Sequence, residues 1–245
     1  MTHDYDYVAD NIKRVSEGIA GAVSRRGNVC VNDGTVRLMA VTKTVEAEKI
    51  CFACEHGVTL LGENRVQEML GKRDMYPAAA EVHFIGGLQT NKVKQVVGAV
   101  SCVHSVDSER LLQEINSRVG GFGSPGESVL DVLLEINVGG EDSKNGVSVA
   151  DGTARVCELA DFACSLPYVR LRGLMTIPPV CDSDGAMKYF TKTREVFETV
   201  KGCNKTLLAG GFDILSMGMS GDFEQAVLCG ATIVRVGTAL FGRRL

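Results

Sequence analysis

The feature of this sequence that most constrains its fold is a regular alternation of short apolar runs with segments long enough for a helix. Eight such runs, rich in β-branched residues, are predicted to be strands: 36–41, 57–62, 82–85, 102–104, 129–136, 169–174, 214–217 and 233–236. Strands that alternate with helices form a parallel sheet. Eight repeats without a Pro/Gly/Ser-rich linker predict one closed α/β barrel over residues 1–245 as a single domain, rather than an open sheet.

An additional helix is predicted before the first strand. Between residues 5 and 26 apolar side chains recur at helical spacing, at Val8, Ile12, Val15, Ile19 and Val23. The chain ends a few residues after the last predicted strand, which leaves no room for an eighth following helix. We therefore expect the N-terminal helix to occupy that place against the barrel.

Charge and hydropathy exclude several classes of partner. With 26 Lys+Arg against 30 Asp+Glu, the formal net charge is −4, and nucleic acids and anionic membranes need a concentrated basic surface instead. No stretch approaches the roughly 18 apolar residues of a membrane span, and the N-terminus lacks the pattern of a secretory signal. The nine scattered cysteines are typical of reduced cytosolic thiols. We expect a cytoplasmic protein with neither a nucleic-acid nor a membrane partner.

Barrel geometry singles out Lys43. Functional groups of α/β barrels lie at the carboxyl ends of the strands, and the first predicted strand runs directly into Thr42 and Lys43. An amine at that position loses hydration beside an apolar core, which favours the neutral form that attacks a carbonyl. From position alone, a surface lysine in a loop is the simpler interpretation.

The last two predicted strands indicate a phosphate site. Residues 216–220, Ser-Met-Gly-Met-Ser, run into a helix, and Arg235, Gly237 and Thr238 close the eighth strand. Hydroxyls, backbone N–H groups and a cation bind phosphate well. Because the eighth strand pairs with the first in a closed barrel, this site would adjoin Lys43. A lysine next to a phosphate site fits either of two classes of protein, a phosphosugar aldolase or a protein that holds pyridoxal 5′-phosphate (PLP) as a Schiff base.

Seven sequence blocks, in order along nearly the whole chain, resemble those of the PLP homeostasis (YggS/PROSC) family. They are residues 40–44 (Ala-Val-Thr-Lys-Thr), 61–68, 83–86, 88–92, 171–175, 215–220 and 235–242. Members of that family are single-domain relatives of the alanine racemase barrel. The resemblance implies a single (β/α)8 TIM barrel of the alanine racemase N-terminal domain type, with an extra N-terminal helix, that binds PLP.

The resemblance also implies roles for individual residues. The family's cofactor-binding positions match Lys43, Asn64, His83, Ser216, Met217, Arg235, Gly237 and Thr238. Among them, Lys43 matches the Schiff-base lysine and Arg235 the arginine that faces the pyridine nitrogen. Ser216, Gly237 and Thr238 match the phosphate-binding positions. Gly87 and Thr90 stand where the family commonly has proline and serine, and these departures concern loop geometry.

Storage, buffering or delivery of PLP within the cell, by a monomer, is the function that the resemblance implies. A cationic Arg235 disfavours the protonated ring nitrogen that makes this cofactor a strong electron sink. The chain also has no room for the second domain that supplies the catalytic tyrosine of racemases. We therefore expect no catalytic turnover and expect PLP-dependent apoenzymes as recipients. A PLP-dependent amino-acid racemase or decarboxylase is the alternative, and a phosphosugar aldolase is a third.

Other signals carry less weight. Residues 121–126 match G-x-G-x-x-G but follow a predicted helix and precede a strand, the reverse of the dinucleotide-binding arrangement. Cys51 and Cys54 have C-x-x-C spacing without a second pair of metal ligands nearby. His3, His56 and His104 show no ligand spacing. The loop 139–146 follows the fifth predicted strand and borders the expected site.

Overall fold

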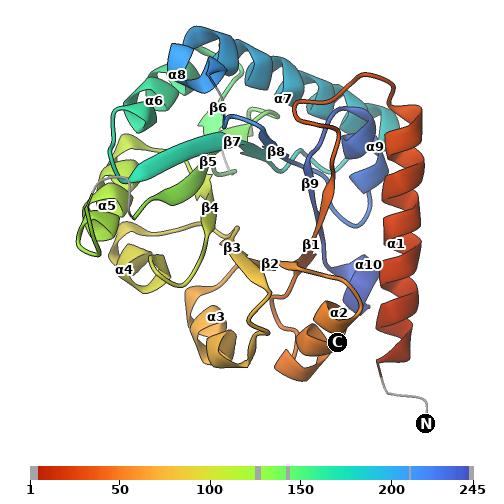
Figure 1. The fold of residues 1–245 in the computed structure, drawn as a ribbon. Helices are drawn as coiled ribbons and strands as arrows, with labels where there is room; N and C mark the ends of the chain where they lie inside the picture. The colour runs from red at the N-terminus through yellow and green to blue at the C-terminus, as the bar shows by residue number, and fades with distance from the viewer. Residues whose placement is uncertain (1–4, 125–127, 142–143, 210, 243–245) are drawn as a thin grey trace.

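Strand β1 pairs with both β2 and β9, and this double pairing, together with that of β4 with β5, closes a ring of parallel strands (Figure 1). The computed structural model describes residues 5–124, 128–141, 144–209 and 211–242. The strands of the ring, in order around it, are β1 (Arg37–Val41), β2 (Leu60–Glu63), β3 (Glu81–Phe84), β4 (Cys102–Val106), β5 (Leu130–Asn137), β7 (Val169–Thr176), β8 (Ile214–Ser216) and β9 (Ile233–Val236). The predicted (β/α)8 barrel is confirmed.

The strand boundaries differ from the prediction by more than one residue in three strands. β4 and β7 continue to Val106 and Thr176, two residues beyond the predicted ends, because polar side chains there do not end the extended backbone. β2 begins only at Leu60. A two-residue strand, β6 (Val147–Ser148), was not expected and pairs with the carboxyl end of β5 outside the ring.

Helices surround the barrel. They are α1 (Asp6–Arg25), α2 (Ala47–Glu55), α3 (Val66–Lys72), α4 (Val93–Val96), α5 (Glu109–Gly120), α6 (Ala154–Cys164), α7 (Ser183–Cys203), α8 (Lys205–Leu208), α9 (Phe223–Leu228) and α10 (Thr238–Phe241), with 3₁₀ turns η1 (Arg73–Met75) and η2 (Thr90–Lys92). The four-residue α10 follows β9, where no helix was expected. Within the described residues, no helix is long and apolar enough to cross a membrane.

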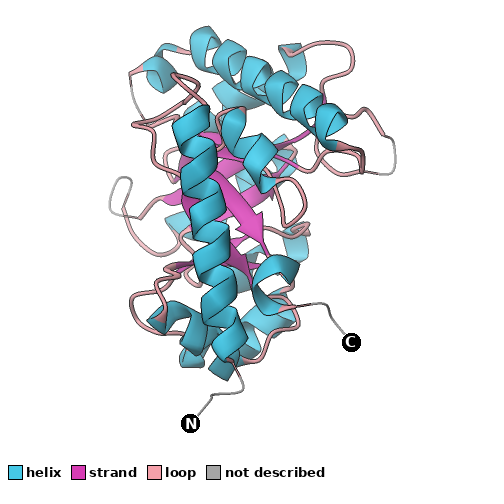
Figure 2. Cartoon of the chain, turned by 90° about the vertical axis from the view of Figure 1, so that its right-hand side faces the viewer, coloured by secondary structure: helices cyan, strands magenta, loops and turns pink. Residues whose placement is uncertain are grey.

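Helix α1 covers the outside of the barrel beside α9 and α10, as the sequence predicts (Figures 1 and 2). Tyr7 Oη and Asn11 Nδ2 donate to the carbonyls of Phe241 and Leu240 at 3.2 and 2.9 Å. Its apolar stripe is buried: Val8, Ile12, Val15, Ile19 and Ala22. The helix therefore packs where a full-length eighth crossover helix would otherwise lie, and it satisfies carbonyls at the end of the short α10.

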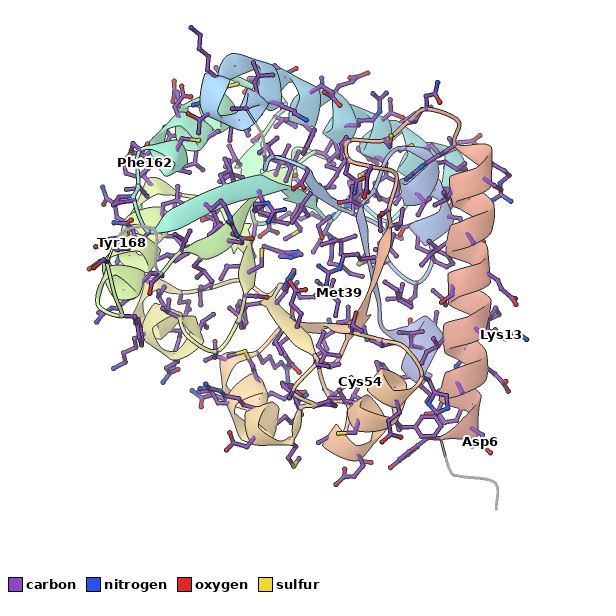
Figure 3. The ribbon with its side chains drawn as sticks, viewed as in Figure 1. Asp6, Lys13, Met39, Cys54, Phe162 and Tyr168 are labelled. Atoms are coloured by element: carbon purple, nitrogen blue, oxygen red, sulfur yellow. The ribbon has the colours of Figure 1, made fainter. Side chains whose placement is uncertain are left out.

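Side chains fill the barrel interior (Figure 3). Outward-facing strand residues such as Ala40 and Leu61 join the helices in one large apolar cluster, whereas their neighbours Met39 and Leu60 pack inside the ring with Ile233. This alternation follows from the two-residue period of a strand. The interior also contains buried polar side chains, and these build the candidate site.

Some features singled out from the sequence lie partly or wholly outside the described residues. These are His3, positions 125 and 126 of the glycine motif, and positions 142 and 143 of the loop after β5. Cys51, on α2, donates through its thiol to Met75 O at 3.2 Å.

Candidate functional site

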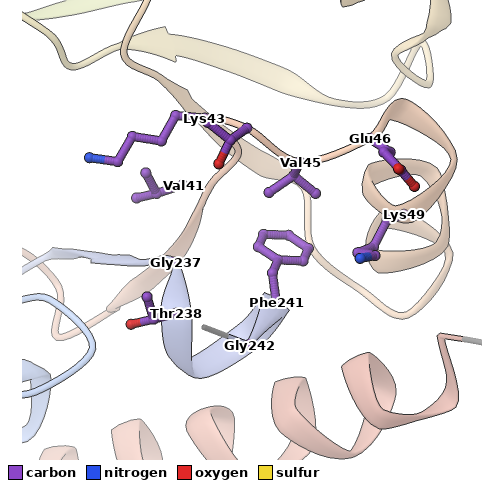
Figure 4. A pocket seen from close by; sticks show the side chains of 10 residues that line it. Val41, Lys43, Val45, Glu46, Lys49, Gly237, Thr238, Phe241 and Gly242 are labelled. Atoms are coloured by element: carbon purple, nitrogen blue, oxygen red, sulfur yellow. The ribbon is translucent and has the colours of Figure 1, made fainter. Parts of the chain in front are cut away.

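The carboxyl ends of β1 and β9 enclose a pocket of about 340 Å³ (Figure 4). Its lining comes from the turn after β1, from α2 and from the β9–α10 junction: Val41, Lys43, Thr44, Val45, Glu46, Lys49, Gly237, Thr238, Phe241 and Gly242. Figure 4 shows the amine end of Lys43 and the hydroxyl of Thr238 on the same side of the β1 end. The pairing of β1 with β9 therefore brings the predicted lysine and part of the predicted phosphate site into one pocket.

A buried ion cluster holds the backbone immediately before Lys43. Lys72 Nζ donates to the carbonyl of Thr42 at 2.9 Å and lies 3.1 Å from Glu63 Oε1. The hydroxyls of Thr42 and Tyr76 each donate to Glu63 Oε1 at 2.6 Å. Burial and the neighbouring Glu63 carboxylate raise the pKa of Tyr76 well above its ordinary value, so the phenol remains a donor. Because Glu63 is fully buried, these three partners are what make its charge tolerable there.

The residue immediately after Lys43 is also fixed. The backbone N–H of Thr44 donates to Glu68 Oε1, which lies 2.9 Å from Lys72 Nζ. Thr44 has φ +61°, a left-handed conformation that a β-branched residue rarely adopts. Such a conformation persists only where the surroundings enforce it, and it is common at functional sites. The two flanks of Lys43 are therefore anchored to one ion pair on α3, Thr42 to Lys72 and Thr44 to Glu68.

Backbone N–H groups converge at the start of α10. Those of Gly237 and Ala239 both donate to Ser220 Oγ, each at 3.2 Å. Ser220 follows a turn in which Gly218 has φ +91°, and an ideal Cβ on Gly218 would lie 2.5 Å from Ala226 Cβ. Only glycine fits that turn. The two amides thus converge on the hydroxyl oxygen of Ser220, whose own hydrogen can be donated. Convergent backbone N–H groups beside a hydroxyl donor are suited to binding an anion.

Ser216 occupies a different environment from Ser220. It is fully buried at the end of β8, where its Oγ accepts from Arg235 Nη1 at 2.8 Å and lies 3.1 Å from His104 Nδ1. Arg235 Nη2 donates to the carbonyl of Thr176 at 2.9 Å. The structure therefore groups Ser216 with Arg235 inside the barrel, whereas Ser220 is the hydroxyl at the Gly237 turn.

Arg235 is buried and keeps its charge. Burial lowers its pKa to about 10, against the opposing effect of the Glu135 carboxylate. Burial likewise raises the pKa of Glu135 to about 7, an effect that Arg235 partly offsets.

A second pocket of about 340 Å³ lies at the carboxyl ends of β3, β4 and β5. It is lined by Glu135 and the buried Ser105, together with Gly87, Leu88, Gln89, Asp107 and Asn145.

His83 lies inside the barrel, outside the first pocket. His83 Nδ1 is 2.8 Å from His104 Nε2, and His83 Nε2 is 2.6 Å from Glu81 Oε1. Both imidazoles are buried. Glu81 also pairs with Arg37, and both belong to the amino ends of their strands.

The eight predicted cofactor residues thus fall into distinct places. Three line the first pocket (Lys43, Gly237 and Thr238), and three form hydrogen bonds inside the barrel (His83, Ser216 and Arg235). Asn64 is half-buried and follows β2. Its backbone lies against Gly86, where an ideal Cβ would be 2.1 Å from the carbonyl oxygen of Asn64. Met217 is fully buried in the large apolar cluster. Their contacts with a cofactor stay predictions.

Ser220 lay in the predicted phosphate segment 216–220 but was not among the named cofactor residues, and neither Glu81 nor the pairing of His104 with His83 was predicted. Ser220 lies within the quoted block 215–220, and only the turn at Gly218 distinguishes it from Ser216. The histidines belong to neighbouring strands, and their proximity depends on the register that pairs His83 with Cys102. A lone sequence does not specify that register.

Comparison with known proteins identifies the family of this chain and agrees with its fold. The family model described as "Alanine racemase, N-terminal domain" matches residues 25–244. A relative from Aquifex aeolicus named "Pyridoxal phosphate homeostasis protein" is 41% identical over 96% of this chain and 97% of its own. A crystal structure of an unknown protein from Bifidobacterium adolescentis has a TM-score of 0.83 at 34% identity and covers 98% of both chains. The structure of PipY from Synechococcus elongatus with PLP bound has a TM-score of 0.74 at 30% identity, covering 93% of this chain and 100% of PipY.

Proposed function

This chain belongs to the alanine racemase N-terminal domain family and, within it, to the pyridoxal phosphate homeostasis proteins, and from that premise we propose that it binds PLP through Lys43 and holds it for delivery. The observation that carries the proposal is the single pocket lined by Lys43, Gly237 and Thr238. A primary amine beside an anion-binding turn matches the two reactive ends of PLP, its aldehyde and its phosphate.

Lys43 would form the covalent link. Its amine would hold PLP through the aldehyde carbon as a Schiff base, with the aldehyde oxygen released as water. The anchors on Thr42 and Thr44 hold the backbone on both sides of this lysine, which favours one orientation of its side chain. When bound, PLP supplies an electron-withdrawing pyridine ring conjugated to that link.

Ser220, Gly237, Thr238 and Ala239 would bind the phosphate. The amides of Gly237 and Ala239 already converge on the hydroxyl of Ser220, and Thr238 adds a second, exposed hydroxyl. Hydrogen bonds from neutral donors to an ionised acceptor are stronger than those between neutral groups. We therefore assign to Ser220 the phosphate contact that the sequence resemblance assigns to Ser216.

Arg235 supports a holding role over a catalytic one. Two of its five N–H donors bond Ser216 and Thr176, which fixes the guanidinium at the carboxyl end of the barrel. A cation opposite the pyridine nitrogen disfavours its protonation and so weakens stabilisation of a carbanion. We propose that the protein stores PLP as a monomer in the cytoplasm, where its nine free thiols are stable, and passes it to PLP-dependent apoenzymes.

Transfer and turnover assays distinguish this role from the racemase or decarboxylase alternative. PLP-loaded protein, freed of unbound cofactor, is expected to restore activity to the apo form of a PLP-dependent aminotransferase. Loaded Lys43→Ala protein should restore none, and Lys49→Ala, which removes the other lysine of the pocket, should behave as the unaltered chain does. Sustained racemisation or decarboxylation of an amino acid that disappears in Lys43→Ala would overturn the carrier role.

A further inference from the structure

A chain of hydrogen-bonded side chains crosses the barrel from the buried Arg235 to the partly exposed Glu81. Its links are Arg235 Nη1 to Ser216 Oγ at 2.8 Å, Ser216 Oγ to His104 Nδ1 at 3.1 Å, His104 Nε2 to His83 Nδ1 at 2.8 Å, and His83 Nε2 to Glu81 Oε1 at 2.6 Å. Ser216 and His104 are fully buried and His83 is 1% exposed. The chain begins beside the carboxyl ends of β8 and β9 and ends at the first residue of β3, so it spans the barrel.

The donors and acceptors of this chain have one consistent direction. An ionised carboxylate only accepts, so His83 Nε2 carries the hydrogen that it donates to Glu81. A neutral His83 then has its lone pair on Nδ1, and His104 must donate to it through Nε2–H. The lone pair of His104 is therefore on Nδ1, where it accepts from the hydroxyl of Ser216. Ser216 Oγ in turn accepts from Arg235.

The charges around the chain favour this direction over its reverse. The hydrogen bond from His83 and the guanidinium of Arg37 hold the pKa of Glu81 well below its ordinary value, so its carboxylate is ionised at neutral pH. Reversing the chain requires a second proton on His83, and His104 would then donate to Ser216 alongside Arg235. Burial and the charge of Arg235 hold the pKa of His104 well below its ordinary value, which opposes positive charge in this part of the interior.

We propose that Ser216, His104, His83 and Glu81 are positioning residues for Arg235, and that their directed hydrogen bonds couple the amino-terminal end of the barrel to the ring-nitrogen partner of the cofactor. The contact of Arg235 with the ring rests on the proposed function. The direction of the chain does not, because it follows from the protein's own donors and acceptors. His83 accordingly acts through Arg235 rather than by touching the cofactor.

Imidazole tautomers test the direction in the cofactor-free protein. The protein has four histidines, so the rings of ¹⁵N-labelled protein can be assigned by long-range ¹H–¹⁵N correlation. We expect His83 and His104 both to carry hydrogen on Nε2 alone at pH 7.5. His56, which is exposed on the outside of the barrel, serves as the internal reference. A doubly protonated His83, or a His104 with hydrogen on Nδ1, would overturn the direction.

Metal analysis adds a second test. Cys102 lies near the histidine pair, with the potential ligand atoms of all three within 4.8 Å of one another. A bound ion would need the lone pairs that the hydrogen bonds use. Stoichiometric zinc in the purified protein would therefore contradict the hydrogen bonds proposed between His83 and His104. The expected result is the absence of zinc together with the Nε2–H tautomers.

The coupling is tested at the other end, on PLP labelled with ¹⁵N in its ring. Glu81→Gln removes the negative charge and replaces an acceptor-only carboxylate by an amide that can accept or donate, and it is expected to shift the ring-nitrogen resonance. Glu224→Gln is the matched control, since Glu224 also pairs with an arginine at the surface. In a Ser216→Ala background, where the chain is cut, Glu81→Gln should cause no further shift. Glu81→Asp, which keeps a carboxylate acceptor, should restore most of the original resonance.

Equal effects of Glu81→Gln with and without Ser216, or no effect in either background, would overturn the coupling. Thermal unfolding shows whether each variant is folded, and His83→Gln replaces Glu81→Gln if that variant is not. Failure of the protein to bind PLP would contradict the proposed function but would leave the tautomer result standing. Binding without coupling would contradict only this inference.

Discussion

Gly237 lies directly against Val41. A Cβ placed on Gly237 would be 3.4 Å from Val41 Cβ and 3.5 Å from its carbonyl oxygen, at the point where β9 returns to β1. Two residues after Val41 comes Lys43, and one residue after Gly237 comes Thr238. Closure of the barrel is therefore what brings the first and last strands, almost two hundred positions apart, to a common pocket.

Ser220→Ala should weaken binding of PLP by about tenfold to a hundredfold, because a hydrogen bond to a charged group contributes roughly 1.5–3 kcal/mol. Pyridoxal, which has no phosphate, should bind this variant as it binds the unaltered chain. Ser216→Ala should instead affect the two ligands alike. Fluorescence titration with PLP and with pyridoxal measures these affinities. Selective loss of PLP binding in Ser216→Ala, with Ser220→Ala unaffected, would show that the sequence-based assignment of Ser216 is the right one.

Tyr76→Phe should lower the free energy of unfolding by roughly 1.5–3 kcal/mol, because it removes a hydrogen bond of 2.6 Å to the buried carboxylate of Glu63. Tyr7→Phe is the matched control. Its hydroxyl donates to a neutral carbonyl at the surface, where the loss should stay below about 1 kcal/mol. Urea unfolding of the two variants provides the comparison, and equal losses would contradict a special contribution of the Glu63 cluster.

Glu135 should make the folded state less stable as the pH rises. Its folded pKa of about 7 lies above the ordinary 4.5, so between these values the folded state holds a proton that the unfolded state has released. Stability falls with pH wherever the folded state binds more protons. Between pH 5 and pH 8 this group should cost about 2–3 kcal/mol.

Urea unfolding of the cofactor-free protein at both pH values checks this expectation, with Glu135→Gln as the comparison. The variant should lose less stability over the interval, because the amide does not titrate. Identical pH dependence in the two proteins would show that Glu135 has an ordinary pKa in the folded state.

The sequence predicted the barrel because apolar runs and helical segments alternate throughout it. The place of α1 also followed, since its apolar stripe needs a surface and, among the described residues, β9 is followed by the short α10. The strand ends were harder to predict. Ser105 and Thr176 are polar residues that resemble loop residues in a sequence, yet both lie within strands of the barrel.

The site was predicted where it depends on strand ends and missed where it depends on side-chain direction. Lys43 and Thr238 follow their strands immediately, so their positions come from the topology. Ser216 and Ser220 are close in sequence, but one points into the barrel and the other follows the turn at Gly218. Strand register, which local patterns do not contain, decides that His83 meets His104.

Reduction of the PLP-loaded protein with borohydride, followed by peptide mapping, tests the central claim most directly. Borohydride converts a carbon–nitrogen double bond between PLP and an amine into a stable single bond, so the modified residue can be identified by mass spectrometry. We predict a visible absorption band that disappears on reduction and a phosphopyridoxyl group on Lys43. The Lys49→Ala variant should give the same adduct. A protein that carries no adduct after incubation with PLP, or carries it on Lys49 with Lys43 unmodified, would contradict the account.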